Sequence, residues 1–180
     1  MQSVIDQLPE NWQTELERRL LEMQQNRCVK RGYIASPCRA ATTAELRQNM
    51  EAARFYMYYA MRHLQLNAVA PHAYVPALLN DGQPAERAQA LRFGQRLLEF
   101  SDELHVCGGT LTCGMLQEAE HAILLRLPVT VYHPELCLEL KKLATRCGAE
   151  KKLVRYDERH PLLSCTSREL FTPALERRYA

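Results

Sequence analysis

The stretch ELHVCGGTLTCG, residues 103–114, decides the fold class. Its first five residues are typical of a short buried strand, and the glycine pair that follows is typical of a loop. A helical pattern begins near Gly114. A strand, a tight loop and a helix in this order predict one unit of a parallel β-sheet.

The same alternation continues on both sides of this stretch. Strands are expected at residues 32–35, 66–70, 103–107, 128–132 and 152–156, the last at an edge, and helices at residues 43–64, 85–100, 114 onward and 135–147. Strands that alternate with helices of ten or more residues favour a parallel sheet covered on both faces. We therefore predict a three-layer α/β sandwich of the flavodoxin or Rossmann type, with four or five parallel strands.

Both ends of the chain extend this core. Residues 11–25 place Trp12, Leu16 and Leu20 at helical spacing, which predicts an added amphipathic helix. Lys and Arg outnumber acidic residues from Lys141 onward. We expect an N-terminal helical extension over 1–27, the α/β domain over 28–148, and a basic C-terminal extension over 149–180 that packs on the domain.

Composition excludes several classes of function. The 180 residues are 47% hydrophobic, enough for a core, and their net charge of +2 disfavours a polybasic binder of nucleic acid or of anionic membranes. Without a signal peptide or an apolar run of bilayer length, we expect a cytoplasmic location. Seven cysteines without a CxxC pair argue against a disulfide framework and a zinc ribbon. We expect neither a metal nor a cofactor.

The loops after the first three strands are the expected ligand site, because open parallel sheets bind ligands beyond the carboxyl ends of their strands. Gly108 and Gly109 lead toward a helix whose N–H groups could hold a phosphate, although a plain tight turn explains them equally well. Arg39 has a guanidinium suited to phosphate, or is a surface arginine.

Glu118 lies one helical turn after Gly114, and therefore near the same loops. A carboxylate at this place could act as a nucleophile or as an acid or base. A Glu in the first turns of a helix is also favoured by the helix dipole alone. Both interpretations stay open at this point.

Several short motifs, taken together, resemble the nucleoside 2-deoxyribosyltransferases and small phage and bacterial proteins related to them. The resemblance covers about residues 32–132 and rests on YIASP (33–37), APH (70–72), SDELHV (101–106), GMLQE (114–118) and the PV pair (128–129). It implies that Glu118 attacks the anomeric carbon of a nucleoside, that Tyr33 orients this carboxylate, and that Asp102 also serves catalysis. The family has an Asp where this chain has Thr112.

We predict that the ligand is a nucleoside or nucleotide. The expected ligand contacts are Ser36, Pro37, Arg39, His72, Gly108, Gly109, Thr112, Gly114 and Met115. The leading hypothesis is cleavage of an N-glycosidic bond or deoxyribosyl transfer. The alternative is a module that binds or sequesters a nucleotide without turning it over. We also expect a homodimer or a larger homo-oligomer, and no nucleic-acid polymer as a partner.

Overall fold

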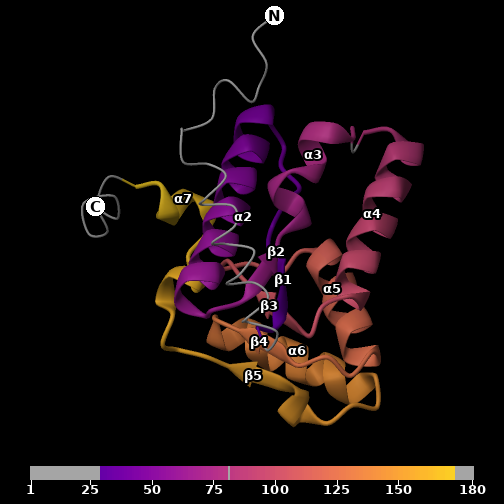
Figure 1. The fold of residues 1–180 in the computed structure, drawn as a ribbon, viewed down its shortest axis with the longest axis vertical. Coiled ribbons are helices and arrows are strands. Elements are labelled where there is room, and N and C mark those ends of the chain that lie inside the picture. The colour runs from indigo at the N-terminus through magenta and orange to yellow at the C-terminus, as the bar shows by residue number, and fades with distance from the viewer. Residues whose placement is uncertain (1–28, 81, 173–180) are drawn as a thin grey trace, which may run out of the picture.

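A parallel β-sheet organises the chain, in a computed structural model that describes residues 29–80 and 82–172 (Figure 1). Its strand order is β2-β1-β3-β4-β5. The strands are β1 (Arg31–Ala35), β2 (Asn67–Val69), β3 (Glu103–Val106), β4 (Val129–Val131) and β5 (Val154–Tyr156). This arrangement confirms the predicted parallel sheet with five strands. The predicted helix at 11–25 and the extension over 1–27 lie outside the described residues.

Four long helices form the outer layers. They are α2 (Thr43–His63), α4 (Pro84–Glu99), α5 (Cys113–Leu124) and α6 (Pro134–Arg146). The chain passes from β1 to β2 in one direction along the sheet, and from β2 through β3 to β5 in the other. Because parallel crossovers are right-handed, this reversal places α2 on one face and the other three helices on the opposite face. The predicted three-layer α/β sandwich is confirmed.

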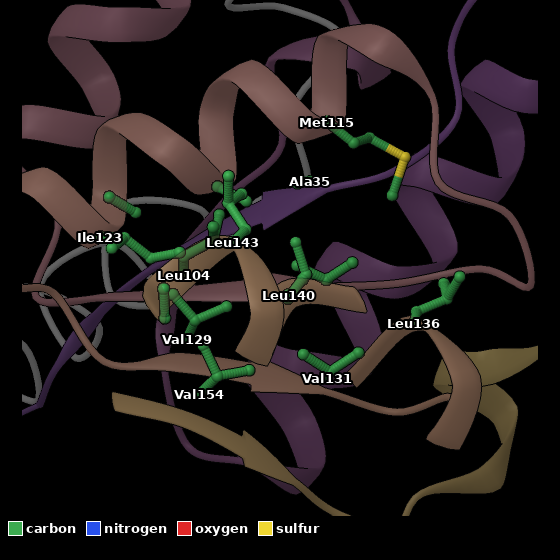
Figure 2. Close-up of a cluster of buried hydrophobic side chains, with 14 of the residues drawn as sticks. Ala35, Leu104, Met115, Ile123, Val129, Val131, Leu136, Leu140, Leu143 and Val154 are labelled. Atoms are coloured by element: carbon green, nitrogen blue, oxygen red, sulfur yellow. The ribbon is translucent and has the colours of Figure 1, made fainter. Parts of the chain in front are cut away.

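The apolar core between the sheet and helices α5 and α6 holds these layers together (Figure 2). Alternate residues of β3 and β4 point into it, among them Leu104 and Val129, and Leu140 of α6 is fully buried against them. Truncation of such a buried leucine to alanine costs about 2–5 kcal/mol. The intervening strand residues, such as His105, therefore face the α2 side.

The C-terminal segment adds the fifth strand and then crosses the α2 side of the sheet. Its short elements are η3 (Lys151–Leu153), η4 (Pro161–Ser164) and α7 (Ser167–Leu170). Elsewhere in the chain, the short elements η2 (Pro71–Ala73) and α3 (Val75–Leu78) follow β2. Ser167 Oγ donates to Asn49 Oδ1 of α2 at 2.7 Å, and Arg168 pairs with Glu45 at 3.0 Å. Within the described residues, no helix is long and apolar enough to cross a bilayer.

Candidate active site

A tyrosine of β1 and a glutamate of α5 meet on the α4–α5 side of the sheet. The hydroxyl of Tyr33 donates a hydrogen bond of 2.6 Å to Glu118 Oε1. Tyr33 is fully buried, and the side chain of Glu118 is 18% exposed. Thr112 caps α5 by accepting from Met115 N–H, and the buried Met115, Ala119 and Ala122 turn one face of the helix, with Glu118, toward the sheet.

Burial controls the protonation of this pair. It raises the pKa of Glu118 to about 7, against the smaller lowering effect of the hydrogen bond from Tyr33. The pKa of Tyr33 is raised well above its usual value by burial first and by the Glu118 carboxylate second, so the phenol keeps its proton and donates it to the hydrogen bond. Glu118 Oε2 is buried and accepts no hydrogen bond from residues 29–80 or 82–172.

His72 joins the pair from the loop after β2. Its Nε2 lies 3.7 Å from Glu118 Oε1, and its side chain is about a quarter exposed. Pro71 starts the turn η2 that carries this histidine. The structure thus brings together three residues that were predicted from the sequence, Tyr33, His72 and Glu118, from three separate elements.

Helix α4 passes over the phenol of Tyr33 at a glycine. A Cβ added at Gly94 would lie 3.2 Å from the Tyr33 hydroxyl oxygen. One residue earlier, Phe93 makes an edge-on ring contact with Tyr74, with 6.4 Å between centroids. Neither Gly94 nor the two rings were among the predicted site residues. A glycine inside a helical pattern, at position 94, was the available signal.

Asp102 does not join this group, contrary to the role expected for it. It precedes β3 and therefore lies at the amino edge of the sheet, where its carboxylate holds the guanidinium of Arg31 at 2.8 Å and accepts from the Arg31 N–H. These hydrogen bonds lower the pKa of Asp102 to about 2. The carboxylate anchors the start of β1 to the start of β3.

The Gly108 amide is not available to a phosphate. Its N–H donates to the Leu163 carbonyl at 2.8 Å, so the C-terminal segment of the chain contacts the loop at this point. A Cβ at Gly109 would lie 3.1 Å from Thr166 Cγ2, which shows how closely the segment approaches. The positive φ of 89° at Gly108 favours glycine for backbone reasons alone.

The sequence matches a known protein family over more than half of its length. A family model described as a domain of unknown function (DUF7768) matches residues 30–132. The chain belongs to this family. The match spans Tyr33, His72 and Glu118. No curated protein matches the sequence.

One solved structure similar to this DUF7768 protein is a 2-deoxyribosyltransferase from the psychrotolerant bacterium Bacillus psychrosaccharolyticus. The two share 16% sequence identity with a TM-score of 0.45, over 58% of this chain and 72% of that chain.

The remaining residues that were predicted to contact the ligand differ in burial and in hydrogen bonding in the DUF7768 protein. Met115 is buried in the core on the α5–α6 side of the sheet, because it lies on the inner face of α5, and it is not exposed to a ligand. The Thr112 hydroxyl caps α5 by accepting a hydrogen bond from the Met115 N–H. The others lie as follows: Gly114 and Arg39 are exposed, Pro37 packs on Gly108, and Ser36 is buried with no partner for its Oγ in the described residues.

The described part of the DUF7768 protein contains no cluster of three or more His, Cys, Asp or Glu residues arranged to hold a metal ion.

Proposed function

We propose that the protein cleaves or transfers the N-glycosidic bond of a nucleoside or nucleotide, with Glu118 as the nucleophile. The observation that supports this proposal is the unequal use of the two carboxylate oxygens. Oε1 is held by the Tyr33 hydroxyl at 2.6 Å, whereas Oε2 is buried and accepts no hydrogen bond from the described residues. An oriented carboxylate with one free oxygen is suited to capture an electrophilic carbon.

In the proposed reaction, Glu118 Oε2 forms an ester bond to C1′ while the bond between C1′ and the base nitrogen breaks. The electron pair of that bond leaves with the base. Positive charge develops on the sugar in the transition state, and an anion beneath the ring stabilises it. Water, or the nitrogen of a second base, then attacks C1′ and restores the carboxylate.

The departing base needs a proton, and His72 is placed to supply it. Its Nε2 lies 3.7 Å from Glu118 Oε1, and 23% of its side chain is exposed to solvent. Asp102 is held by Arg31 at the amino edge of the sheet, so the proposed mechanism does not use it as the proton donor. A histidine can give and take protons near neutral pH.

Binding without turnover is the second candidate, and position 112 favours it. Thr112 caps α5, so its hydroxyl is engaged by the Met115 amide at 3.3 Å. The sequence resemblance implies an Asp at this position in active transferases. A site without that carboxylate would retain a nucleotide pocket and lose part of the machinery for turnover.

One experiment separates the two candidates. The full chain is incubated with purine and pyrimidine nucleosides, their 2′-deoxy forms and their 5′-monophosphates, with and without a second free base. Chromatography then measures free base and new nucleoside. Release of base supports the enzyme, whereas saturable binding by calorimetry without release supports the binding module. If the protein neither releases base from these compounds nor binds any of them, both candidates are excluded.

We also propose that the protein assembles as a homodimer or a larger homo-oligomer. Large apolar side chains are exposed along α3 and α4, with Leu78 at 75% exposed and Leu91 and Phe93 nearly half exposed. Exposed large apolar side chains are candidates for burial in an association surface. Phe93 also contacts Tyr74, on the loop that follows His72, so the surface adjoins the proposed site.

A further inference from the structure

A second cleft opens on the other face of the sheet from Glu118. It has a volume of about 760 Å³ and lies over β3, β4 and the residues after β5. Helix α2 contacts β1 and β2 on this face (Figure 1), and its last residue, His63, is among the residues that line the cleft. The volume is within the range of small-molecule sites.

Four polar side chains form a continuous chain of hydrogen bonds at the floor of this cleft. Lys30 Nζ donates to Glu103 Oε2 at 2.8 Å, and Glu103 Oε1 lies 3.1 Å from His105 Nε2. His105 Nδ1 lies 2.7 Å from the Tyr132 hydroxyl. Glu103, His105 and Tyr132 are buried, and all four residues line the cleft.

The direction of these bonds follows from the carboxylate. The hydrogen bond from His105 and the contact with Lys30 lower the pKa of Glu103 to about 2, so Glu103 only accepts. His105 Nε2 therefore carries a proton. Whether Nδ1 accepts from the Tyr132 hydroxyl or donates to it, the phenol oxygen keeps a lone pair that can accept a hydrogen bond from a group in the cleft.

Fold stability does not explain this arrangement. On the opposite face, the same strands carry Leu104, Val106 and Val129, which pack into an apolar core. Buried charge networks give no more stability than apolar side chains of the same size, because each charge loses its hydration. Strands of a buried parallel sheet are usually apolar on both faces. The polar floor therefore points to a function.

The lining carries charges of both signs: Lys30, Arg155 and Arg159 against Glu103, Asp157 and Glu158. Lys30 keeps 59% of its side chain exposed and has N–H groups beyond the one that Glu103 uses. Arg155 is exposed and forms no ion pair within the described residues. Arg159 forms a two-point contact with Asp157, and Glu158 adds a further rim carboxylate. After these pairs are formed, Arg155 is the lysine or arginine of the lining that has no carboxylate partner in the described residues.

We propose that this cleft is a second ligand site, which takes a small phosphate monoester that carries free hydroxyl groups. Arg155 binds the phosphate, since its guanidinium can form two parallel hydrogen bonds with the phosphate oxygens. A ligand hydroxyl donates to the Tyr132 oxygen at the floor. The proposal does not depend on the reaction assigned to Glu118.

Calorimetry on the full chain tests it with ribose 5-phosphate as the probe and ribose as the uncharged control. We expect saturable binding of ribose 5-phosphate only. Arg155→Gln and Tyr132→Phe should each weaken it at least tenfold. Arg92→Gln, an exposed arginine of α4 outside the cleft, and Glu118→Gln should leave it unchanged. In the wild type, the imidazole ¹⁵N signals of His105 should shift on binding.

Three outcomes would overturn the second site. They are no saturable binding at millimolar ribose 5-phosphate, equal binding of ribose, and binding that survives Arg155→Gln but is lost in Glu118→Gln. The last outcome would place the probe at Glu118 instead. Arg155 is exposed and unpaired in the described residues, so its replacement leaves the fold intact and the test valid.

Discussion

The hydroxyl of Tyr33 donates a hydrogen bond of 2.6 Å to Glu118 Oε1 across 85 residues of sequence. Strand β1 and helix α5, which are far apart in the sequence, thus hold a buried carboxylate in a fixed orientation. The carboxylate lies beside the point where the strand order reverses, between β1 and β3. Sheets of this topology commonly bind their ligands near that point.

Replacement of Glu118 by glutamine tests its chemical role. The amide retains the shape of the side chain and removes the anion, so turnover should fall by orders of magnitude while ligand affinity changes little. Glu120→Gln, an exposed glutamate on the same helix, is the matched control and should keep full turnover. Chromatography and calorimetry on both variants give the two quantities. Full turnover in Glu118→Gln would exclude the nucleophile.

The same substitution should change how stability depends on pH. Burial raises the pKa of Glu118 from 4.5 to about 7, so the folded state holds this proton more tightly than the unfolded state. The stability from this group is complete below pH 4.5 and is lost as the pH rises to 7, an effect of at most about 3 kcal/mol. Glu118→Gln should lack this decline.

Urea unfolding of both proteins at pH 5 and pH 8 measures the effect. Other titrating groups are common to the two proteins, so the difference between them isolates Glu118. The glutamine variant should gain on the wild type at pH 8. An equal change in unfolding free energy between the two pH values in both proteins would contradict a buried carboxyl at this site.

Gly94 should act as a positioning residue for Tyr33. An alanine there favours the helix by about 1 kcal/mol, but its Cβ would lie 3.2 Å from the phenol oxygen and displace it from Glu118. Because the loss of this hydrogen bond offsets the helix gain, Gly94→Ala should change the melting temperature little and lower kcat more than it raises KM. Gln95→Ala, on the exposed side of α4, is the control. Unchanged kcat would show that the phenol tolerates the methyl group.

The assembly proposal concerns the apolar surface of α3 and α4. Leu78→Glu with Leu91→Glu places charges on exposed positions, so the fold should remain while association is lost. Light scattering at micromolar concentration should give a dimer or larger species for the wild type and a monomer for the double variant. The matched pair Lys142→Glu with Arg146→Glu, at exposed positions of α6, should keep the assembly of the wild type. A monomeric wild type would refute the proposal.

The sheet and its helices were predictable because their signals are local. Apolar strands, glycine or proline stops and helical periodicity lie within about 20 residues of one another, and they define β1 to β5 with small shifts at the ends. The pairing of Tyr33 with Glu118 came from the family resemblance, since no local pattern connects residues that distant. The hydrogen bond between them is the structural counterpart of that expectation.

Contacts between distant segments were not predictable from local patterns. The sequence left open whether Gly108 faces a phosphate or forms a plain tight turn, and only the fold shows that its amide donates to Leu163. The polar floor has a signal in the sequence, because Glu103 and His105 alternate with Leu104 and Val106 in a strand that is expected to be buried. Sequence alternation shows that a face is polar, and tertiary structure shows whether a cleft covers it.

Asp102 gives the last prediction, because the sequence and the structure assign it different roles. The resemblance implied a catalytic carboxylate, whereas the structure holds Asp102 at the amino edge of the sheet, in a two-point contact with Arg31 that lowers its pKa to about 2. Asp102→Asn should leave kcat and KM unchanged and lower the melting temperature modestly. Arg31→Gln should lower it similarly, and the double variant should lose little more, because both changes remove one contact. A large fall in kcat for Asp102→Asn, with the melting temperature unchanged, would restore the catalytic assignment.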